Sequence, residues 1–473
     1  MLQAFINIFR IPELRNRVLF TLGILVIYRL GFWVPIVGVD QSVLAENADL
    51  ATKGGTAFGR IVQFASVFSG GNLAQSTIFG LGIMPYITAS IIFQLLQSVV
   101  PTLQDLKKEG ASGQQKINEW TRYATVGLCI FQGWMWLTYM KSASLVVPYF
   151  AEGGTNGLLF YVSGIASLTA GSLFLMWLGE QIDKRGIGNG VSMILTAGIL
   201  AQMPNAVKWV VENFNRSTTS ADAGQIGLAG VLVLTAGFVI VTAGAIIITV
   251  AQRRIPIQQA KLTRGRKVYG GQRHYLPLRV NHAGVMPIIF ASSLMIFPSA
   301  IFEWLASRAS ESNATSGWWL ATTDLLAGSF QIGHYPYVVL EIVMIYFFSY
   351  FWTTVQFSPD EMSKQLKEHG SFIPGLRPGP RTAEYLETVM ERITYVGAGF
   401  LAVIAVIPTF VTSKLGIDFM VSQFLGGTGL LIVVSVALDL VQRLEANLVM
   451  RNYAGFLAAG SDRAGPRVRS ARG

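Results

Sequence analysis

The chain has 473 residues, of which 52% are hydrophobic and only 13% are charged. Its mean hydropathy of +0.48 is far above that of a soluble globular protein, so the composition argues against a soluble enzyme. The formal net charge of +10 is therefore carried by a chain whose apolar runs are long enough to cross a bilayer, which takes about 20 helical residues.

Ten such runs occur, and we expect each to be a transmembrane helix. In chain order they lie near residues 18–37, 76–100, 123–140, 155–179, 191–211, 225–250, 283–303, 335–357, 394–412 and 423–442. Residues 1–17 lack an apolar core followed by a small-residue cleavage site, so they do not read as a cleavable signal. Their apolar residues share one helical face, and we expect this stretch to lie along the cytoplasmic interface.

The distribution of basic residues predicts the orientation of these spans. Most of the 36 Lys and Arg residues fall in the N-terminus, the even-numbered loops and the C-terminal tail 443–473. By the positive-inside rule both termini are cytoplasmic. Setting the orientation and contacting anionic lipid would account for most of this positive charge.

Ten spans divide into two halves of five, 18–211 and 225–442, joined by the external segment 212–224. An odd number of spans per half means that a duplicated unit would be inverted relative to its partner. The external segment is a candidate hinge, although a short solvated loop explains it equally well. The cytoplasmic loops 252–281 and 358–392 are long and polar, and the basic cluster in the first suits acidic protein, lipid headgroups or RNA phosphate.

The first external segment contains an apolar stretch, 56–68, that is too short to cross the membrane. As a helix, about 13 residues would extend only about 20 Å. Ser69, Gly70 and Gly71 then interrupt it. A half-inserted helix at this position would line or block a cavity, because irregular backbone is tolerated at membrane depth only where protein buries it or water reaches it. A surface amphipathic helix is the alternative.

Motifs for catalysis are missing from the sequence: it contains no phosphate-binding loop, no nucleophile elbow and no H-E-x-x-H pair. The four histidines are scattered without the spacing of metal ligands. We therefore expect no enzyme activity, no catalytic residue, no metal and no cofactor. The spans also carry few ionisable groups, chiefly Arg29 and Asp439, which disfavours an ion-coupled transporter.

Two pairs of aliphatic residues lie four apart, so each pair shares a helical face: Ile83 with Ile87, and Val191 with Leu195. Ordinary packing explains such pairs in most proteins. If they faced a pore, they would form an apolar constriction that excludes water and ions by dewetting.

Several long stretches of the chain resemble the SecY/Sec61-alpha family of protein-conducting channels. These stretches are FSGG (Phe68 to Gly71), LGIMPYITASIIFQLL (Leu81 to Leu96), MWLGEQ (Met176 to Gln181), RGIGNG (Arg185 to Gly190), AGVMPIIFASS (Ala283 to Ser293), FIPGLRPG (Phe372 to Gly379), TAEYLE (Thr382 to Glu387) and FLGGTGLLIVV (Phe424 to Val434). The resemblance implies an all-α integral membrane protein, with ten transmembrane helices in two pseudo-symmetric inverted halves of five around a central pore.

The resemblance also implies roles for residues of this sequence. The hydrophobic pore ring would consist of Ile83, Ile87, Val191, Leu195, Ile289 and Ile432. A plug at about 56–73 would include Phe64, Phe68, Gly70 and Gly71. A lateral gate would carry Thr88, Gln94, Ser292 and Ser293, and a docking surface for partners would include Arg253, Arg254 and Arg377.

The function that the resemblance implies is a channel that passes unfolded secretory polypeptides across the membrane and releases transmembrane segments sideways into lipid. Implied partners are the small membrane subunits SecE and SecG, the motor ATPase SecA, the ribosome, signal sequences and anionic lipids. The implied location is the bacterial inner membrane. Two alternatives stay open: a secondary transporter for a small solute, which should have a polar site at mid-membrane, and a scaffold without transport.

Overall fold

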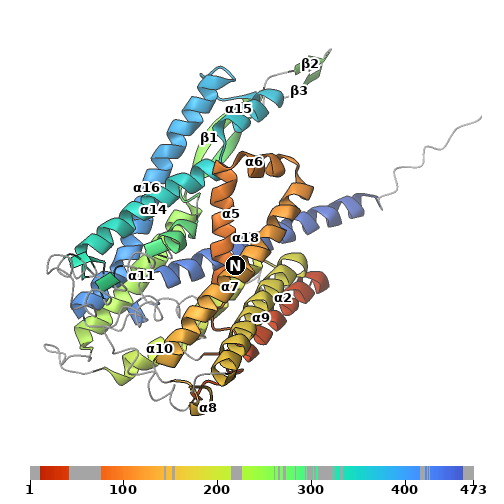
Figure 1. Ribbon diagram of the computed structural model, residues 1–473. Helices are drawn as coiled ribbons and strands as arrows, with labels where there is room; N and C mark the ends of the chain where they lie inside the picture. The colour runs from red at the N-terminus through yellow and green to blue at the C-terminus, as the bar shows by residue number, and fades with distance from the viewer. Residues whose placement is uncertain are drawn as a thin grey trace, which may run out of the picture.

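The computed structural model is mostly helical, and its helices form an elongated bundle with a small set of strands at one end (Figure 1). The residues that it describes are 11–41, 76–142, 145–151, 155–214, 226–259, 262–264, 267–269, 273–282, 284–292, 294–295, 302, 305–306, 322, 325–326, 328–330, 334–415, 421–422, 424 and 427–461.

A helix covers most of each expected span that is described, although the helix ends differ, and three short helices lie between the spans. The helices are α2 (Pro12–Gly31), α5 (Met84–Val99), α6 (Pro101–Lys108), α7 (Ala111–Ser142), α8 (Pro148–Ala151), α9 (Thr155–Arg185), α10 (Gly190–Glu212), α11 (Leu228–Val250), α14 (Tyr335–Gln356), α15 (Pro359–Glu368), α16 (Pro380–Leu415) and α18 (Thr428–Ser461). The seventh expected span, 283–303, is described only in part, and residues 286–292 within it are helical.

By length and composition, five helical stretches in the described part of the chain qualify as membrane spans, or six if α5 and α6 are counted as one span bent by 96°. Two further features agree with a membrane environment. The helices α7, α16 and α18 have 32, 36 and 34 residues, more than the roughly 20 that a bilayer requires, so each is long enough to project beyond it. The most apolar of the five qualifying stretches, α11, has only 17% of its apolar window buried inside the protein, as expected for a helix facing lipid.

The start of the second span differs from its expected position. Residues 76–83 form turns, and the α-helix begins only at Met84. Gly82 has a φ of +60°, a conformation that residues with a Cβ rarely adopt, and Pro85 in the first helical turn fits a helix start because its missing N–H is not needed there.

Strands occur within the two loops that are expected to be cytoplasmic, which the sequence did not lead us to predict. The strands are β1 (Gln252–Gln259), β2 (Leu262–Arg264), β3 (Lys267–Tyr269), β4 (Arg273–Arg279) and β5 (Ser371–Phe372). One antiparallel sheet has the order β4-β1-β5, and β2 and β3 form a second hairpin. Figure 1 places β1, α15 and the β2–β3 hairpin at one end of the molecule, with α8 at the opposite end.

The apolar core is divided among several clusters. One joins α5, α9 and α10 to Ile289 and Ile432, a second lies among α11, α14 and α16, and a third lies between α7 and α9. A fourth lies at the strand end of the molecule, where Ile255, Leu278 and Ile373 pack against Leu386 and Ile393 of α16. The paired loops therefore have an apolar core of their own.

Candidate functional site

A cavity of about 410 Å³ lies among α5, α10, α18 and the residues that follow β4. Five of the six residues of the expected ring line it: Ile87, Val191, Leu195, Ile289 and Ile432. The other end of the lining is polar and is contributed by the segment before α10, the end of β4 and the middle of α18. The cavity is therefore apolar on one side and polar toward the strand end.

The expected ring residues come together in one apolar cluster. Ile83, Ile87, Leu195, Ile289 and Ile432 are between 2% and 6% exposed. The sixth, Val191, is partly buried and packs against the same cluster. Side chains that lie far apart in the sequence thus close the apolar side of the cavity.

The start of α5 fixes the position of the first two ring residues. Ile83 is the N-cap residue of α5, and its carbonyl oxygen accepts a hydrogen bond of 3.1 Å from the N–H of Ile87. Both side chains therefore lie on one face, one turn apart.

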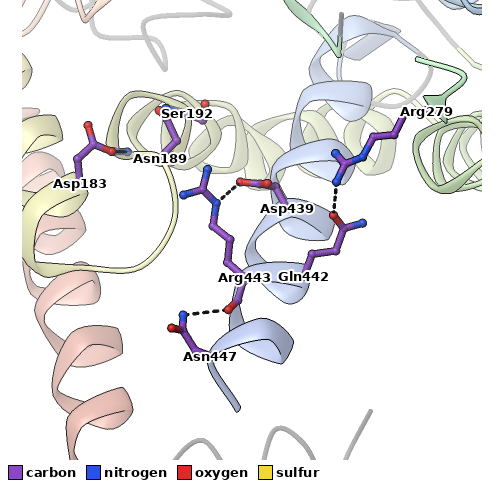
Figure 2. A network of polar contacts seen from close by, with 9 residues as sticks. Asp183, Asn189, Ser192, Arg279, Asp439, Gln442, Arg443 and Asn447 are labelled. Carbon is purple, nitrogen blue, oxygen red and sulfur yellow. Dashed lines mark hydrogen bonds and ion pairs between the residues drawn. The ribbon is translucent and has the colours of Figure 1, made fainter. Parts of the chain in front are cut away.

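The segment before α10 fixes the next two. The carboxylate of Asp183 accepts a hydrogen bond of 2.8 Å from the N–H of Gly190, and the side chain of Asn189 accepts one of 3.1 Å from the N–H of Ser192 (Figure 2). Two N–H groups that would otherwise lack partners at the helix start are satisfied in this way. The turn holds the first two turns of α10, which carry Val191 and Leu195.

A close contact between backbones also requires glycine at this point. A Cβ atom at Gly190 would lie 1.9 Å from the carbonyl oxygen of Gly179 in α9. The roles of Asp183 and Asn189 at this helix start were not predicted from the sequence. The available signal was Asn189 directly before an apolar run, a residue type that often caps a helix.

The two ionisable exceptions in the spans have local partners. Asp439 accepts a hydrogen bond of 2.8 Å from Nε of Arg443 within α18, and it borders the cavity. The guanidinium of Arg29 lies 4.1 Å from the centre of the Phe32 ring, a cation–π contact at the end of α2.

The side of α18 that carries Gln442 contacts the sheet. Nη2 of Arg279, the last residue of β4, donates a hydrogen bond of 3.1 Å to Oε1 of Gln442. Figure 2 shows Arg443 and Gln442 leaving α18 in different directions, with Gln442 directed toward Arg279. Both Arg279 and Gln442 line the cavity.

Several buried polar atoms beside the cavity lack hydrogen-bond partners within the described structure. They belong to Gln94, Thr249, His282 and Ser435. Burial lowers the pKa of His282, and the neighbouring charge of Arg279 lowers it further, so this side chain is held in its neutral form.

The expected gate residues are not all placed at the cavity. Gln94 lines it, and its Nε2 donates a hydrogen bond of 3.3 Å to Ser90. Thr88 is half-buried and Ser292 is buried, but neither is among the described residues that line the cavity. Ser293 lies outside the described residues, as do the expected plug residues Phe64, Phe68, Gly70 and Gly71.

The expected docking residues lie at the strand end and are all exposed. Arg253 and Arg254 are in β1, opposite Leu278 and Pro277 of β4, and Arg377 follows β5. Because β5 pairs with β1, the two loops that carry these residues, which we expect to be cytoplasmic, contribute strands to one sheet. The alternation of buried Ile255 and Ile257 with exposed neighbours was the sequence signal for β1.

No group of three or more His, Cys, Asp or Glu side chains suited to hold a metal ion occurs in the part of the chain that the structure describes.

Comparisons with known proteins agree on one family. The model of the SecY family matches residues 77–441. The protein translocase subunit SecY of Streptomyces coelicolor is 41% identical over 461 residues, covering 97% of this chain and 100% of the relative. The subunit of the same name from Escherichia coli K12 is 40% identical over 450 residues, covering 94% of each chain.

Solved structures agree on the fold. A structure described as a protein-conducting channel has a TM-score of 0.56 at 17% identity and covers 92% of this chain and 93% of its own. Sec61 in the canine ribosome-channel complex has a TM-score of 0.54 at 16% identity, with coverage of 92% and 93%. These likenesses confirm the expected helical membrane fold.

Proposed function

The chain belongs to the SecY family, and on that premise we propose that it is the central pore-forming subunit of a protein translocation channel. Its cargo is the unfolded secretory polypeptide, and transmembrane segments leave it sideways into lipid. The observation that carries the proposal is the set of aliphatic residues, brought together from distant parts of the chain, that closes the apolar side of the 410 Å³ cavity.

The seal follows from the character of those residues. Water is poorly held between closely spaced aliphatic side chains, so a ring of them resists ion flow without any charged group. The ring consists of Ile83, Ile87, Val191, Leu195, Ile289 and Ile432. A polypeptide entering from the polar side of the cavity separates the side chains, which make only non-directional contacts and close again after it passes.

Other parts of the chain complete the proposed channel. The plug at about 56–73 covers the ring from outside and swings at Gly70 and Gly71. The gate opens between the halves 18–211 and 225–442, which turn about the loop 212–224, with Thr88, Gln94, Ser292 and Ser293 along the seam. Small polar side chains suit such a seam, because a hydrogen bond between membrane helices contributes only about 1 kcal/mol.

The energy for transport comes from partners, and the chain itself is not an enzyme. The joined cytoplasmic loops present Arg253, Arg254 and Arg377 to the motor ATPase SecA and to the ribosome. Exposed apolar helices such as α11 leave room for lipid and for the small subunits SecE and SecG. The chain lies in the bacterial inner membrane with both termini in the cytoplasm, where its basic loops contact anionic lipid.

A secondary transporter is the competing function. It predicts a polar binding site among the spans, whereas the described cavity ends on aliphatic side chains. Uptake of a small solute by the protein in vesicles, without motor or ribosome, would favour that alternative. A scaffold without transport predicts that substitutions in the ring leave conductance and export unchanged.

Crosslinking from Ile87 tests the proposal directly. The native Cys129 is the only cysteine in the sequence and is buried, so it is first replaced by Ala. An Ile87→Cys variant should then crosslink to a secretory chain stalled during export. A Leu232→Cys variant is the control, because Leu232 is 62% exposed on α11 and is not among the described residues that line the cavity. A stalled chain that reaches neither cysteine, or both equally, contradicts a path through the ring.

A further inference from the structure

The hydrogen bond between Arg279 and Gln442 joins two segments that are 163 residues apart. Arg279 ends β4, in the loop that carries the proposed docking residues, and Gln442 lies on α18 (Figure 2). The bond measures 3.1 Å from Nη2 to Oε1, a normal length for a hydrogen bond with a charged donor.

Each partner is connected to a residue of the ring. From Arg279 the chain runs through the buried Asn281 to the helical segment that carries Ile289. Gln442 belongs to the same helix as Ile432, about 15 Å along its axis at 1.5 Å per residue. All five of these residues line the cavity, so the bond and the two ring residues lie along one continuous part of its wall.

The backbone of Arg279 is held firmly at the base of the sheet. Arg279 pairs with Gln252 in the register of β1 and β4, and the N–H of Val280 donates a hydrogen bond of 2.9 Å to the carbonyl of Ala251. A Cβ atom at Gly397 of α16 would lie 2.7 Å from the carbonyl oxygen of Val280, so α16 also closes on this strand end. A displacement of the sheet must therefore move Arg279.

The middle of α18 is held from the opposite side. Leu444 packs in one cluster with Leu14 and Ile187, and Leu440 packs against that cluster. These contacts tie α18 to α2 and to the segment before α10. Of the remaining charged side chains drawn in Figure 2, Asp439 and Arg443 pair with each other within α18, and Asp183 bonds the start of α10. Among the side-chain contacts drawn in Figure 2, the hydrogen bond between Arg279 and Gln442 joins the sheet to α18.

We propose that Arg279 and Gln442 form a latch that stabilises the closed ring, and that movement of the sheet on partner docking breaks it. The inference rests on the proposed channel function and adds to it the route from docking to opening. Arg279 acts here as a positioning residue: it moves Ile289 and restrains the helix of Ile432, and it need not touch the cargo. Replacing either partner should shift the resting equilibrium toward the open state.

The test is the resting ion leak of membrane vesicles that contain the full chain. Arg279→Ala and Gln442→Ala should each raise the leak about three- to tenfold, the effect expected for one partly exposed hydrogen bond to a charged group. The double variant should leak no more than either single variant, because both remove the same interaction. Arg443→Ala is the control: like Arg279→Ala it removes one positive charge, but it breaks a contact within α18 and none to the sheet, and its leak should stay at the wild-type level.

Replacing Gln442 by a charged residue distinguishes a latch from a contact that only stabilises the fold. Gln442→Glu places a carboxylate beside the guanidinium of Arg279. The ion pair should hold the latch more tightly than the wild-type hydrogen bond does, so the leak of this variant should equal that of wild type or be lower. When Arg279 is replaced by Ala, adding Gln442→Glu should not lower the leak below that of Arg279→Ala alone. Partner-driven export by Gln442→Glu should slow, since docking must then break an ion pair.

Leak at the wild-type level in both alanine variants, or additive increases in the double variant, overturns the latch. Measuring wild-type export and the Ile87 crosslink in the same vesicles keeps this result separate from the function. If wild type exports and crosslinks while the variants behave like wild type, only the latch is wrong. If wild type neither exports nor crosslinks, the proposed function is wrong as well.

Discussion

Gln258 in β1 pairs with Phe372 in β5 across an antiparallel register, although the two residues belong to different loops, 252–281 and 358–392. The pairing is short, but Ile255 and Ile373 extend it into a shared apolar core with Leu386 of α16. The loops are therefore one unit, and a partner that binds either loop acts on both.

Charge reversal at Arg377 tests that unit as a docking surface. Arg377→Glu should reduce motor-driven export about tenfold, because a like charge placed against an acidic partner repels it, and about 1.4 kcal/mol of lost binding gives a tenfold change. The side chain is exposed, so the fold and the insertion of the chain into the bilayer should not change. Lys364→Glu on α15 is a matched charge reversal in the same loop and should have a much smaller effect. Normal export by Arg377→Glu would refute the assigned contact.

A polar substitution tests the ring as a seal. Leu195 is 5% exposed and borders the cavity, so Leu195→Asn places an amide among aliphatic side chains where water would otherwise be excluded. The resting ion conductance of vesicles should rise by about tenfold or more, if the substitution removes on the order of 1.4 kcal/mol from the barrier to wetting. Leu195→Met keeps the side chain apolar and similar in volume, and should conduct like wild type. Equal conductance of both variants would speak against a dewetting seal.

The contact between α9 and α10 predicts a loss of stability. Gly190→Ala would bring a Cβ atom to 1.9 Å from the backbone oxygen of Gly179, and backbone on both sides must shift. We expect destabilisation of about 1–3 kcal/mol or more, measured as a lower thermal midpoint in detergent. Gly237→Ala on α11 meets no atom within 4 Å and should leave the midpoint unchanged or raise it slightly, because alanine favours helix. Similar midpoints for the two variants would contradict the packing argument.

Removal of the expected plug tests the segment that the sequence alone points to. Deletion of residues 57–70 should raise the resting ion leak, because the ring would then close the channel without support from outside. The measurement is ion flux in vesicles without motor, ribosome or cargo. A replacement of the same length by Gly and Ser residues should leak as well, because such a linker supplies no apolar contacts. An unchanged leak in both variants would count against the plug.

The transmembrane helices could be predicted from sequence because apolar length is a local property. Their ends could not, since α16 begins at Pro380 and continues through charged residues that we interpreted as a loop. Hydropathy marks where a helix crosses the bilayer, but not how far it extends into water on either side.

The ring residues could be predicted as two pairs, because each pair lies on one helix face. Their assembly with Ile289 and Ile432 came from the resemblance, and the structure places all six in and around one cluster. The contacts of Asp183 with Gly190, and of Arg279 with Gln442, could not be predicted, because tertiary folding alone brings these groups together. The short strand β5 could not be predicted for the same reason. Two residues are too few to show the alternation of a strand, and only their pairing with β1 makes them one.

The length of α16 exceeds the thickness of a bilayer. At 1.5 Å per residue its 36 residues extend about 54 Å, against a hydrocarbon layer of about 30 Å. The apolar core under the paired loops is anchored to its first turns, through Leu386 and Ile393. The helix is therefore long enough to carry the paired loops beyond the headgroup layer, where a soluble partner docking as proposed would reach them without displacing lipid.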